Sequence, residues 1–198
     1  MFAAVVLLIA FNNGWAIDVK AETKYPYESR IAELEKYRTT VASIPSVKLI
    51  DHNGRIHDIA KLFRDNILIV DFIFTSCRSI CPIMTAVMKK VYSRIGIPNV
   101  QSVLFLSITV NPEEDTPKQL AESTKKTGNH ANWLWLTGTP NDIAQVLQAF
   151  AININGKPET HPPVLYIGKE DFWLKWVGLP NADEVADAVN VLSKTHIK

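Results

Sequence analysis

Apolar stretches of two kinds follow one another along this chain. One kind is a short, near-continuous run rich in β-branched and aromatic residues, typical of a strand buried on both faces. The other places apolar residues about one turn apart, which predicts a helix. The predicted strands are 66–74, 100–110, 133–136, 164–167 and 171–177, and the predicted helices are 82–95, 117–126, 141–150 and 182–193. This alternation predicts an α/β fold with a mixed, mostly parallel sheet, helices on both faces and an antiparallel hairpin near its end.

The region before residue 66 has a different pattern. Segments 47–51 and 55–59 flank His52-Asn-Gly54, which is typical of a β-hairpin with a tight turn. Upstream, apolar or amphipathic side chains about one turn apart between Ile31 and Val41 predict a short surface helix that ends before Pro45. Because no repeat, low-complexity tract or linker is present, we expect one domain over 46–198 after a polar extension over 17–45.

The chain opens with an apolar run from Phe2 to Phe11, which has the length of a signal-peptide core. Gly14 and Ala16 resemble a cleavage site, although no Lys or Arg precedes the run; the alternatives are a buried helix or a mis-assigned start. We expect residues 1–16 to be a signal peptide or an N-terminal anchor. This leader predicts export to the bacterial periplasm, with membrane association only through the N-terminus, and disfavours the mitochondrial intermembrane space.

Composition narrows the function classes. The chain has 198 residues, with 21 Lys and Arg against 20 Asp and Glu, so its formal charge is +1. Such a balance creates no broad positive field, and we therefore expect no nucleic-acid partner. Two cysteines are too few to hold a fold together by disulfides. Their proximity, at 77 and 81, instead predicts that they act together.

Cys77 and Cys81 lie between the predicted strand 66–74 and the predicted helix 82–95. A helical or turn-like backbone brings two thiols at this spacing to one side, where they can share a metal ion or form a disulfide. The helix N-terminus and the neighbouring Arg78 predict a lowered thiol pKa and a reactive thiolate. The alternative is two inert, buried cysteines.

Two thiolates alone do not complete a transition-metal site, so a histidine is the natural third ligand. We expect His52 and His57 to be solvated residues of the hairpin, and His130 and His196 to be loop and tail residues. His161 differs, because it precedes the predicted strand 164–167 and the sheet can bring it beside the cysteines. Its position alone leaves two roles open, metal ligand or structural loop residue.

Four features together resemble the SCO/SenC family: Phe72-Ile-Phe-Thr-Ser-Cys77, Ile80-Cys-Pro82, the segment from Ser107 to Pro117, and His161 five residues before Tyr166. The resemblance runs from about Val47 to Val189. It implies a thioredoxin-like fold, with the hairpin as an N-terminal addition. It also implies that Cys77, Cys81 and His161 bind one copper ion, Cu(I), Cu(II) or both. The implied function is a metallochaperone that delivers copper to the binuclear copper site of cytochrome c oxidase during assembly.

The implied partners are a copper-receiving oxidase subunit or another copper chaperone. Two departures from the family pattern matter: Arg78-Ser79 replaces an acidic pair between the cysteines, and Asn111 replaces an aspartate. An alternative is supported by the missing acidic residue between the cysteines and by the proline pair after His161, which resembles the proline that faces the active cysteines of thioredoxins. In it the chain is a thiol–disulfide oxidoreductase whose redox-active pair, Cys77 and Cys81, keeps the cysteines of a thiol–disulfide partner reduced.

Overall fold

An open eight-stranded sheet organises the molecule, with the strand order β1-β8-β7-β4-β5-β6-β2-β3. This computed structural model describes residues 26–95, 103–128, 130–155 and 157–194. The strands are β1 (Arg38–Thr39), β2 (Lys48–Asp51), β3 (Ile56–Asp58), β4 (Ile67–Ile73), β5 (Val103–Thr109), β6 (Trp133–Thr137), β7 (Val164–Lys169) and β8 (Phe172–Val177). The helices are α1 (Pro26–Leu34), α2 (Ile59–Asp65), α3 (Ile80–Ile95), α5 (Pro117–Thr124), α6 (Pro140–Ala149) and α7 (Ala182–Lys194), with short 3-10 turns η1 (Glu35–Tyr37) and η2 (Pro158–Thr160).

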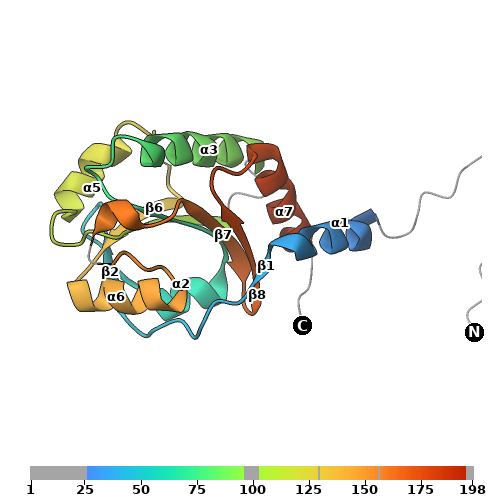
Figure 1. Cartoon of the computed structure of the whole chain (residues 1–198), viewed down its shortest axis with the longest axis horizontal. Coiled ribbons are helices and arrows are strands. Elements are labelled where there is room, and N and C mark those ends of the chain that lie inside the picture. The colour runs from blue at the N-terminus through green and yellow to red at the C-terminus, as the bar shows by residue number, and fades with distance from the viewer. Residues whose placement is uncertain (1–25, 96–102, 129, 156, 195–198) are drawn as a thin grey trace, which may run out of the picture.

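Helices cover both faces of the sheet, as the alternating pattern predicts. Figure 1 shows α3, α5 and α7 on one face and α2 and α6 on the other. β4 is buried along its whole length, and its side chains alternate between the two layers of the core. Ile69 and Ile73 pack in the layer under α3 and α7, whereas Val70 and Phe72 pack in the layer above α2 and α6. The fold class predicted from the sequence is therefore confirmed.

The sheet contains more antiparallel pairing than we expected. Among the described strands, β4 pairs parallel with β5 and β5 with β6, and the other five pairings are antiparallel. The cause is local, because each end of the sheet is built from a hairpin, β2–β3 at one end and β7–β8 at the other. The three parallel strands form the centre, and the predicted N-terminal hairpin is present beside β6.

The N-terminal part differs in detail from the sequence expectation. The helix expected near 31–41 ends at Leu34, and the chain passes through η1 into β1, which pairs with β8 and forms one edge of the sheet. Helix α2 was not predicted; it begins directly after the hairpin, with Asp58 as its N-cap accepting a hydrogen bond from the Lys61 backbone N–H. The expected leader over 1–16 lies outside the described residues.

No helix within the described ranges has the length and apolar character needed to cross a membrane.

Candidate copper and thiol site

The two cysteines lie where the central strand β4 gives way to helix α3. Cys77 lies in the connecting loop, and its backbone N–H donates to the Phe74 carbonyl at 3.1 Å. Cys81 lies in the first turn of α3 and is 8% exposed, whereas Cys77 is only partly buried. Both are free thiols. The strand–loop–helix setting predicted from the sequence is confirmed, and it makes Cys77 the accessible member of the pair.

Cys77 is surrounded by hydrogen-bond donors. The Cys81 backbone N–H points at the Cys77 Sγ, 3.4 Å away, and the Ser79 Oγ lies 3.9 Å from the same sulfur. Burial alone would raise the pKa of Cys77, but donation from the Cys81 thiol and from nearby backbone N–H groups outweighs it, so the pKa lies below the usual thiol value. The lowered pKa predicted from the sequence is present, and its main causes are these hydrogen bonds, not the Arg78 charge.

Cys81 has the opposite character. Burial raises its pKa to about 12, helped by the hydrogen bond that its thiol gives to Cys77 and by the nearby charges of Cys77 and Asp71. Cys81 therefore keeps its proton at neutral pH, and Cys77 is the more acidic thiol of the pair. This asymmetry, together with its greater exposure, makes Cys77 the more reactive thiol of the two.

His161 is buried, with 6% of its surface exposed, in the loop before β7. Its Nδ1 lies 3.0 Å from the Pro162 carbonyl oxygen, and because a carbonyl can only accept, Nδ1 carries the proton. Nε2 is then an unprotonated nitrogen, and it is buried with no hydrogen-bond partner among the described residues. Burial also lowers the pKa of His161, so the ring stays neutral at pH 7. A neutral imidazole with a free lone pair is the form that binds copper.

Phe74 connects the histidine to the cysteine loop. Its ring meets the His161 ring edge-on at a centroid distance of 5.8 Å, and its carbonyl holds the Cys77 backbone. Cys77, Cys81 and His161 nevertheless stop short of a formed site, because no three His, Cys, Asp or Glu side chains of the described residues are arranged to hold a metal ion. Binding by all three residues would require His161 and the cysteine loop to approach each other.

A buried carboxylate that we did not single out from the sequence supports the cysteine loop. Asp115 is fully buried between β5 and α5. One of its oxygens accepts hydrogen bonds from the Thr75 backbone N–H, at 3.0 Å, and from the Thr75 hydroxyl, while the other accepts from Thr109 at the end of β5. Asp115 thus ties the segment before Cys77 to the neighbouring strand. Only its place in the Asn111 to Pro117 segment could have indicated it.

Asp71, inside β4, is a second buried carboxylate that sequence reasoning passed over. The Ser107 hydroxyl donates to its Oδ1 at 2.6 Å, and the Trp133 indole N–H donates in turn to Ser107 at 2.9 Å. Its Oδ2 has no hydrogen-bond partner within the described part of the chain, and burial raises the pKa of Asp71 to about 7. A lone acidic residue within an apolar strand was the sequence signal for this group.

Three further histidines within the described residues, His52, His57 and His130, lie around a different pocket beside β2, β3 and β6. His52 is buried rather than solvated, because β2 pairs with β6 and the Trp135 backbone N–H points at the His52 Nδ1 at 3.4 Å. His57 is partly buried and lies 2.9 Å from the Asp51 carboxylate. His130 packs against the rings of Tyr92 and Trp133. His196 lies outside the described residues.

Comparison with known proteins identifies relatives along most of the chain. The family model described as SCO1/SenC matches residues 35–169. The SCO2-like protein of Rickettsia typhi is 30% identical over 134 residues, 66% of this chain and 64% of the relative. The SCO1 protein homolog of Bacillus subtilis is 34% identical over 106 residues, 52% of this chain and 54% of the relative. The chain thus spans between about half and two thirds of these curated relatives.

A solved structure supports the same assignment at the level of the fold. Arabidopsis thaliana ScoI with copper bound superposes with a TM-score of 0.65 at 24% identity, over 78% of this chain and 100% of that chain. This likeness confirms the thioredoxin-like arrangement that the sequence resemblance implied. The match of the family model to residues 35–169, well over half of the chain, shows that this protein belongs to the SCO1/SenC family.

Proposed function

We propose that this protein is a copper chaperone that binds one copper ion through Cys77, Cys81 and His161. It would deliver the ion to the binuclear copper site of cytochrome c oxidase, directly to an oxidase subunit or through another copper chaperone. The observation that carries the proposal is the unpartnered, unprotonated Nε2 of His161, buried at the end of the sheet that also holds the two thiols. Membership of the SCO1/SenC family supports the same cargo.

The donor set suits a transferable copper ion. Two thiolates favour Cu(I), and an imidazole also accommodates Cu(II), so both oxidation states can bind. Cys77, the more acidic thiol, would bind first, and metal coordination would then displace the proton that burial keeps on Cys81. Because His161 is not yet in place, we propose that loading draws its loop towards the thiols. Release then requires only ligand exchange.

The location we propose is outside the cytoplasm. The N-terminal apolar run supports export, and an oxidising compartment is where a thiol pair of this kind can also form a disulfide. Formation of a Cys77–Cys81 disulfide would remove both sulfur ligands, so the redox state of the pair would control copper binding.

The test is the substitution His161→Ala in the full chain. We expect the variant to lose Cu(II) binding, measured by the sulfur-to-copper charge-transfer absorption, or to weaken it at least tenfold. His130→Ala is the matched control, since His130 precedes β6 and lines the different pocket beside β2, β3 and β6. If the reduced, anaerobic wild-type protein takes up no copper, or if His161→Ala binds copper as wild type does, the three-residue site is wrong.

A second function, thiol–disulfide exchange, is favoured by the opposite pKa shifts of the two cysteines. We propose that Cys77 attacks the disulfide of a partner and that Cys81 then resolves the mixed disulfide. Reduction of a model disulfide peptide tests this, and His161→Ala should keep this activity. Absence of any reduction by the wild-type protein would contradict the second function and leave the first intact.

A further inference from the structure

A pocket of about 280 Å³ lies beside the cysteine pair. Cys77 and Cys81 form part of its wall. The rest of the wall comes from residues 73–75 at the end of β4, from α3, from the end of α5 and the two residues 126–127 after it, and from Trp135 of β6. His161 is not among the residues that line it. The pocket therefore lies next to the reactive sulfur, and Phe74, whose ring contacts that of His161, is part of its wall.

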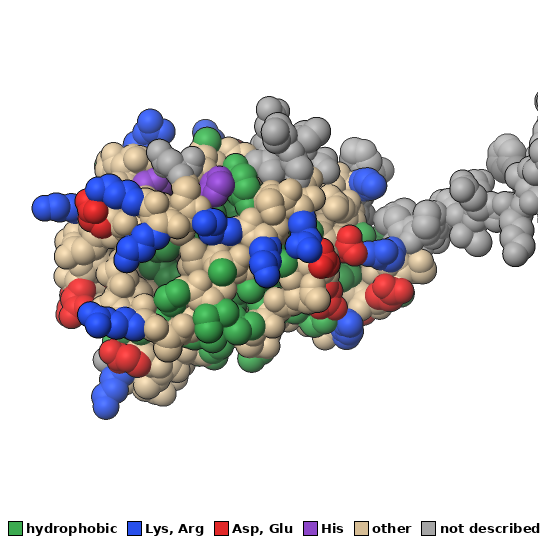
Figure 2. All heavy atoms as spheres, turned by 90° about the horizontal axis from the view of Figure 1, so that it is seen from above, with side chains coloured by type: hydrophobic (Ala, Val, Ile, Leu, Met, Phe, Trp, Pro, Cys, Tyr) green, Lys and Arg blue, Asp and Glu red, His purple; other side chains and the backbone are tan. Residues whose placement is uncertain are grey.

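Two exposed lysines give this pocket a positive charge. Lys89 of α3 and Lys126 after α5 both line it, and neither forms an ion pair with any residue in the described part of the chain. Figure 2 looks down on this face and shows Lys and Arg side chains across its middle, with Asp and Glu side chains nearer its two ends. The charge around the pocket is thus complementary to a carboxylate.

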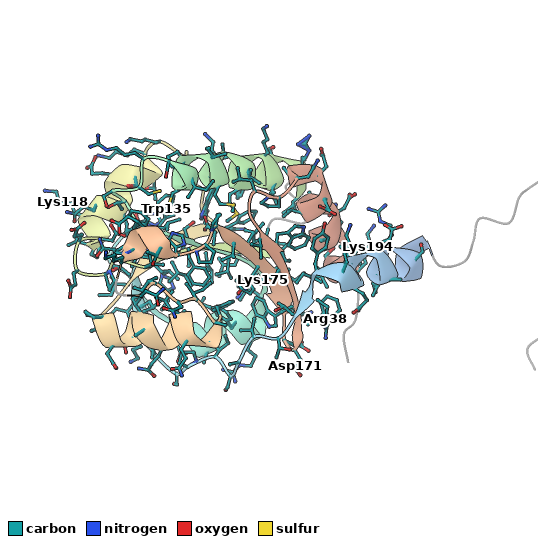
Figure 3. All side chains as sticks on the ribbon, viewed as in Figure 1. Arg38, Lys118, Trp135, Asp171, Lys175 and Lys194 are labelled. Atoms are coloured by element: carbon teal, nitrogen blue, oxygen red, sulfur yellow. The ribbon has the colours of Figure 1, made fainter. Side chains whose placement is uncertain are left out.

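Polar groups within the pocket add hydrogen-bonding capacity. Trp135 lines the pocket, and its indole N–H is buried without a hydrogen-bond partner in the part of the chain that the structure describes, which is costly for a donor of this kind. Figure 3 places Trp135 inside the molecule, by β6 and beneath the helices of this face. Thr85 and Ser123 line the same pocket with hydroxyl groups. The two lysines, the hydrogen-bonding side chains and the adjacent Cys77 thiol together favour an anionic ligand that carries sulfur.

We propose that this pocket binds a small disulfide that carries carboxylates, or its thiol form, and presents its sulfur to Cys77. A volume of about 280 Å³ lies just below the range of about 300–1,000 Å³ for small-molecule sites, which favours a ligand of tripeptide size over a segment of a larger partner. The inference rests on the thiol–disulfide exchange proposed above and names its substrate class. It gives the cysteine pair a way to be oxidised or reduced without a protein partner.

The thiol–disulfide exchange takes place in two steps. The Cys77 thiolate attacks one sulfur of the bound disulfide, so a Cys77–ligand S–S bond forms, the ligand S–S bond breaks and one ligand thiolate leaves. The Cys81 thiol then loses its proton to solvent and attacks Cys77, which forms the Cys77–Cys81 disulfide and releases the second ligand thiolate. The protein loses two electrons and the small disulfide gains them. The reverse sequence reduces the protein.

The test compares two disulfides on the reduced, copper-free full chain: oxidised glutathione, which carries carboxylates, and hydroxyethyl disulfide, which is neutral. We expect Lys89→Gln and Lys126→Gln each to slow the reaction with oxidised glutathione by about 3- to 10-fold, because each removes one attractive charge. The rate with hydroxyethyl disulfide should not change. Lys118→Gln is the matched control, since Lys118 lies at the outer end of α5 in Figure 3 and does not line the pocket.

A binding measurement separates the pocket from the chemistry. S-methylglutathione cannot exchange, and we expect it to shift the NMR signal of the Trp135 indole N–H in the wild-type protein but not in the Lys89→Gln/Lys126→Gln double variant. Equal rates for the lysine variants and wild type with oxidised glutathione, together with no shift at Trp135, would overturn the proposal. If the shift is seen but neither disulfide reacts, the pocket stands and the proposed exchange activity fails.

Discussion

At the scale of single residues, Asp71 is the least expected group, because it places a carboxyl group inside the apolar core. This carboxyl is fully buried in β4, and one of its oxygens has no partner among the residues that the structure describes, so its charged form is disfavoured and its pKa rises. Its pKa of about 7 compares with 3.8 for an exposed aspartate. Its charge also contributes to the raised pKa of Cys81. Ionisation of Asp71 therefore affects both the stability of the sheet and the thiol beside it.

Asp71→Asn should change the pH dependence of stability. Between about pH 4 and 7 the folded wild-type protein holds a proton on Asp71 that the unfolded chain has lost, so the free energy of unfolding falls as pH rises. From pH 5 to 8 this loss should amount to roughly 2–3 kcal/mol. Asparagine cannot ionise and still accepts the Ser107 hydrogen bond. The free energy of unfolding of the variant should therefore not show this decrease between pH 5 and pH 8.

Urea unfolding at pH 5 and pH 8 measures the effect. Asp171→Asn is the control, because Asp171 is exposed in the turn between β7 and β8 and its variant should follow the wild-type pH profile. If the free energy of unfolding changes between pH 5 and pH 8 by the same amount in the wild-type protein and in Asp71→Asn, Asp71 is already ionised in the folded protein at pH 5, and the prediction is wrong.

At the scale of elements, the loop between β5 and α5 supports the loop between β4 and α3. Asp115 accepts from Thr75 on one side and from Thr109 on the other, and all of these partners lie at the ends of adjacent parallel strands. The two loops form one hydrogen-bonded unit, and Cys77 is placed at its edge. This explains why a residue far from the cysteines in sequence can control their position.

Asp115→Asn should loosen this unit. An amide offers one acceptor oxygen in place of two, so a buried donor on Thr75 or Thr109 loses its partner, at a cost of about 1–3 kcal/mol. We expect this loss in the free energy of unfolding, together with faster hydrogen exchange at the Thr75 amide. Glu114→Gln, at an exposed neighbour that accepts from Asn111, should change neither quantity. Unaltered exchange at Thr75 in Asp115→Asn would show that the loop is held by other contacts.

The elements differ in how far the sequence predicted them. Periodicity located β4 and α3, because a fully buried strand and an amphipathic helix leave strong patterns, and the thiols therefore fell at a predicted junction. Helix α2 left a weaker pattern, since its seven residues follow a hairpin strand without a break. The burial of His161, the pKa asymmetry of the cysteines and the role of Asp115 depend on contacts between distant segments, which periodicity does not report.

At the scale of the whole molecule, the sheet brings distant parts of the sequence to one end. β4 runs parallel to β5 and antiparallel to β7. The loop after β4, the loop after β5 and the loop before β7 therefore lie at the same end of the strands. These loops carry the cysteines, the Asp115 segment and His161. A ligand that joins two of them would link elements from the centre and from one side of the sheet, and would therefore stabilise the whole fold.

Copper should accordingly raise the unfolding temperature of the reduced protein only. With free Cu(I) about 100-fold above its dissociation constant, mass action adds about 2.7 kcal/mol, or roughly 5–10 °C for a domain of this size. Differential scanning calorimetry under anaerobic conditions measures the shift. The Cys77–Cys81 disulfide form and Cys77→Ser should show little or no shift, because each lacks a thiolate ligand, and His130→Ala should shift as wild type does. An equal shift in the disulfide form would mean that copper stabilises the fold from a site that does not use the thiols.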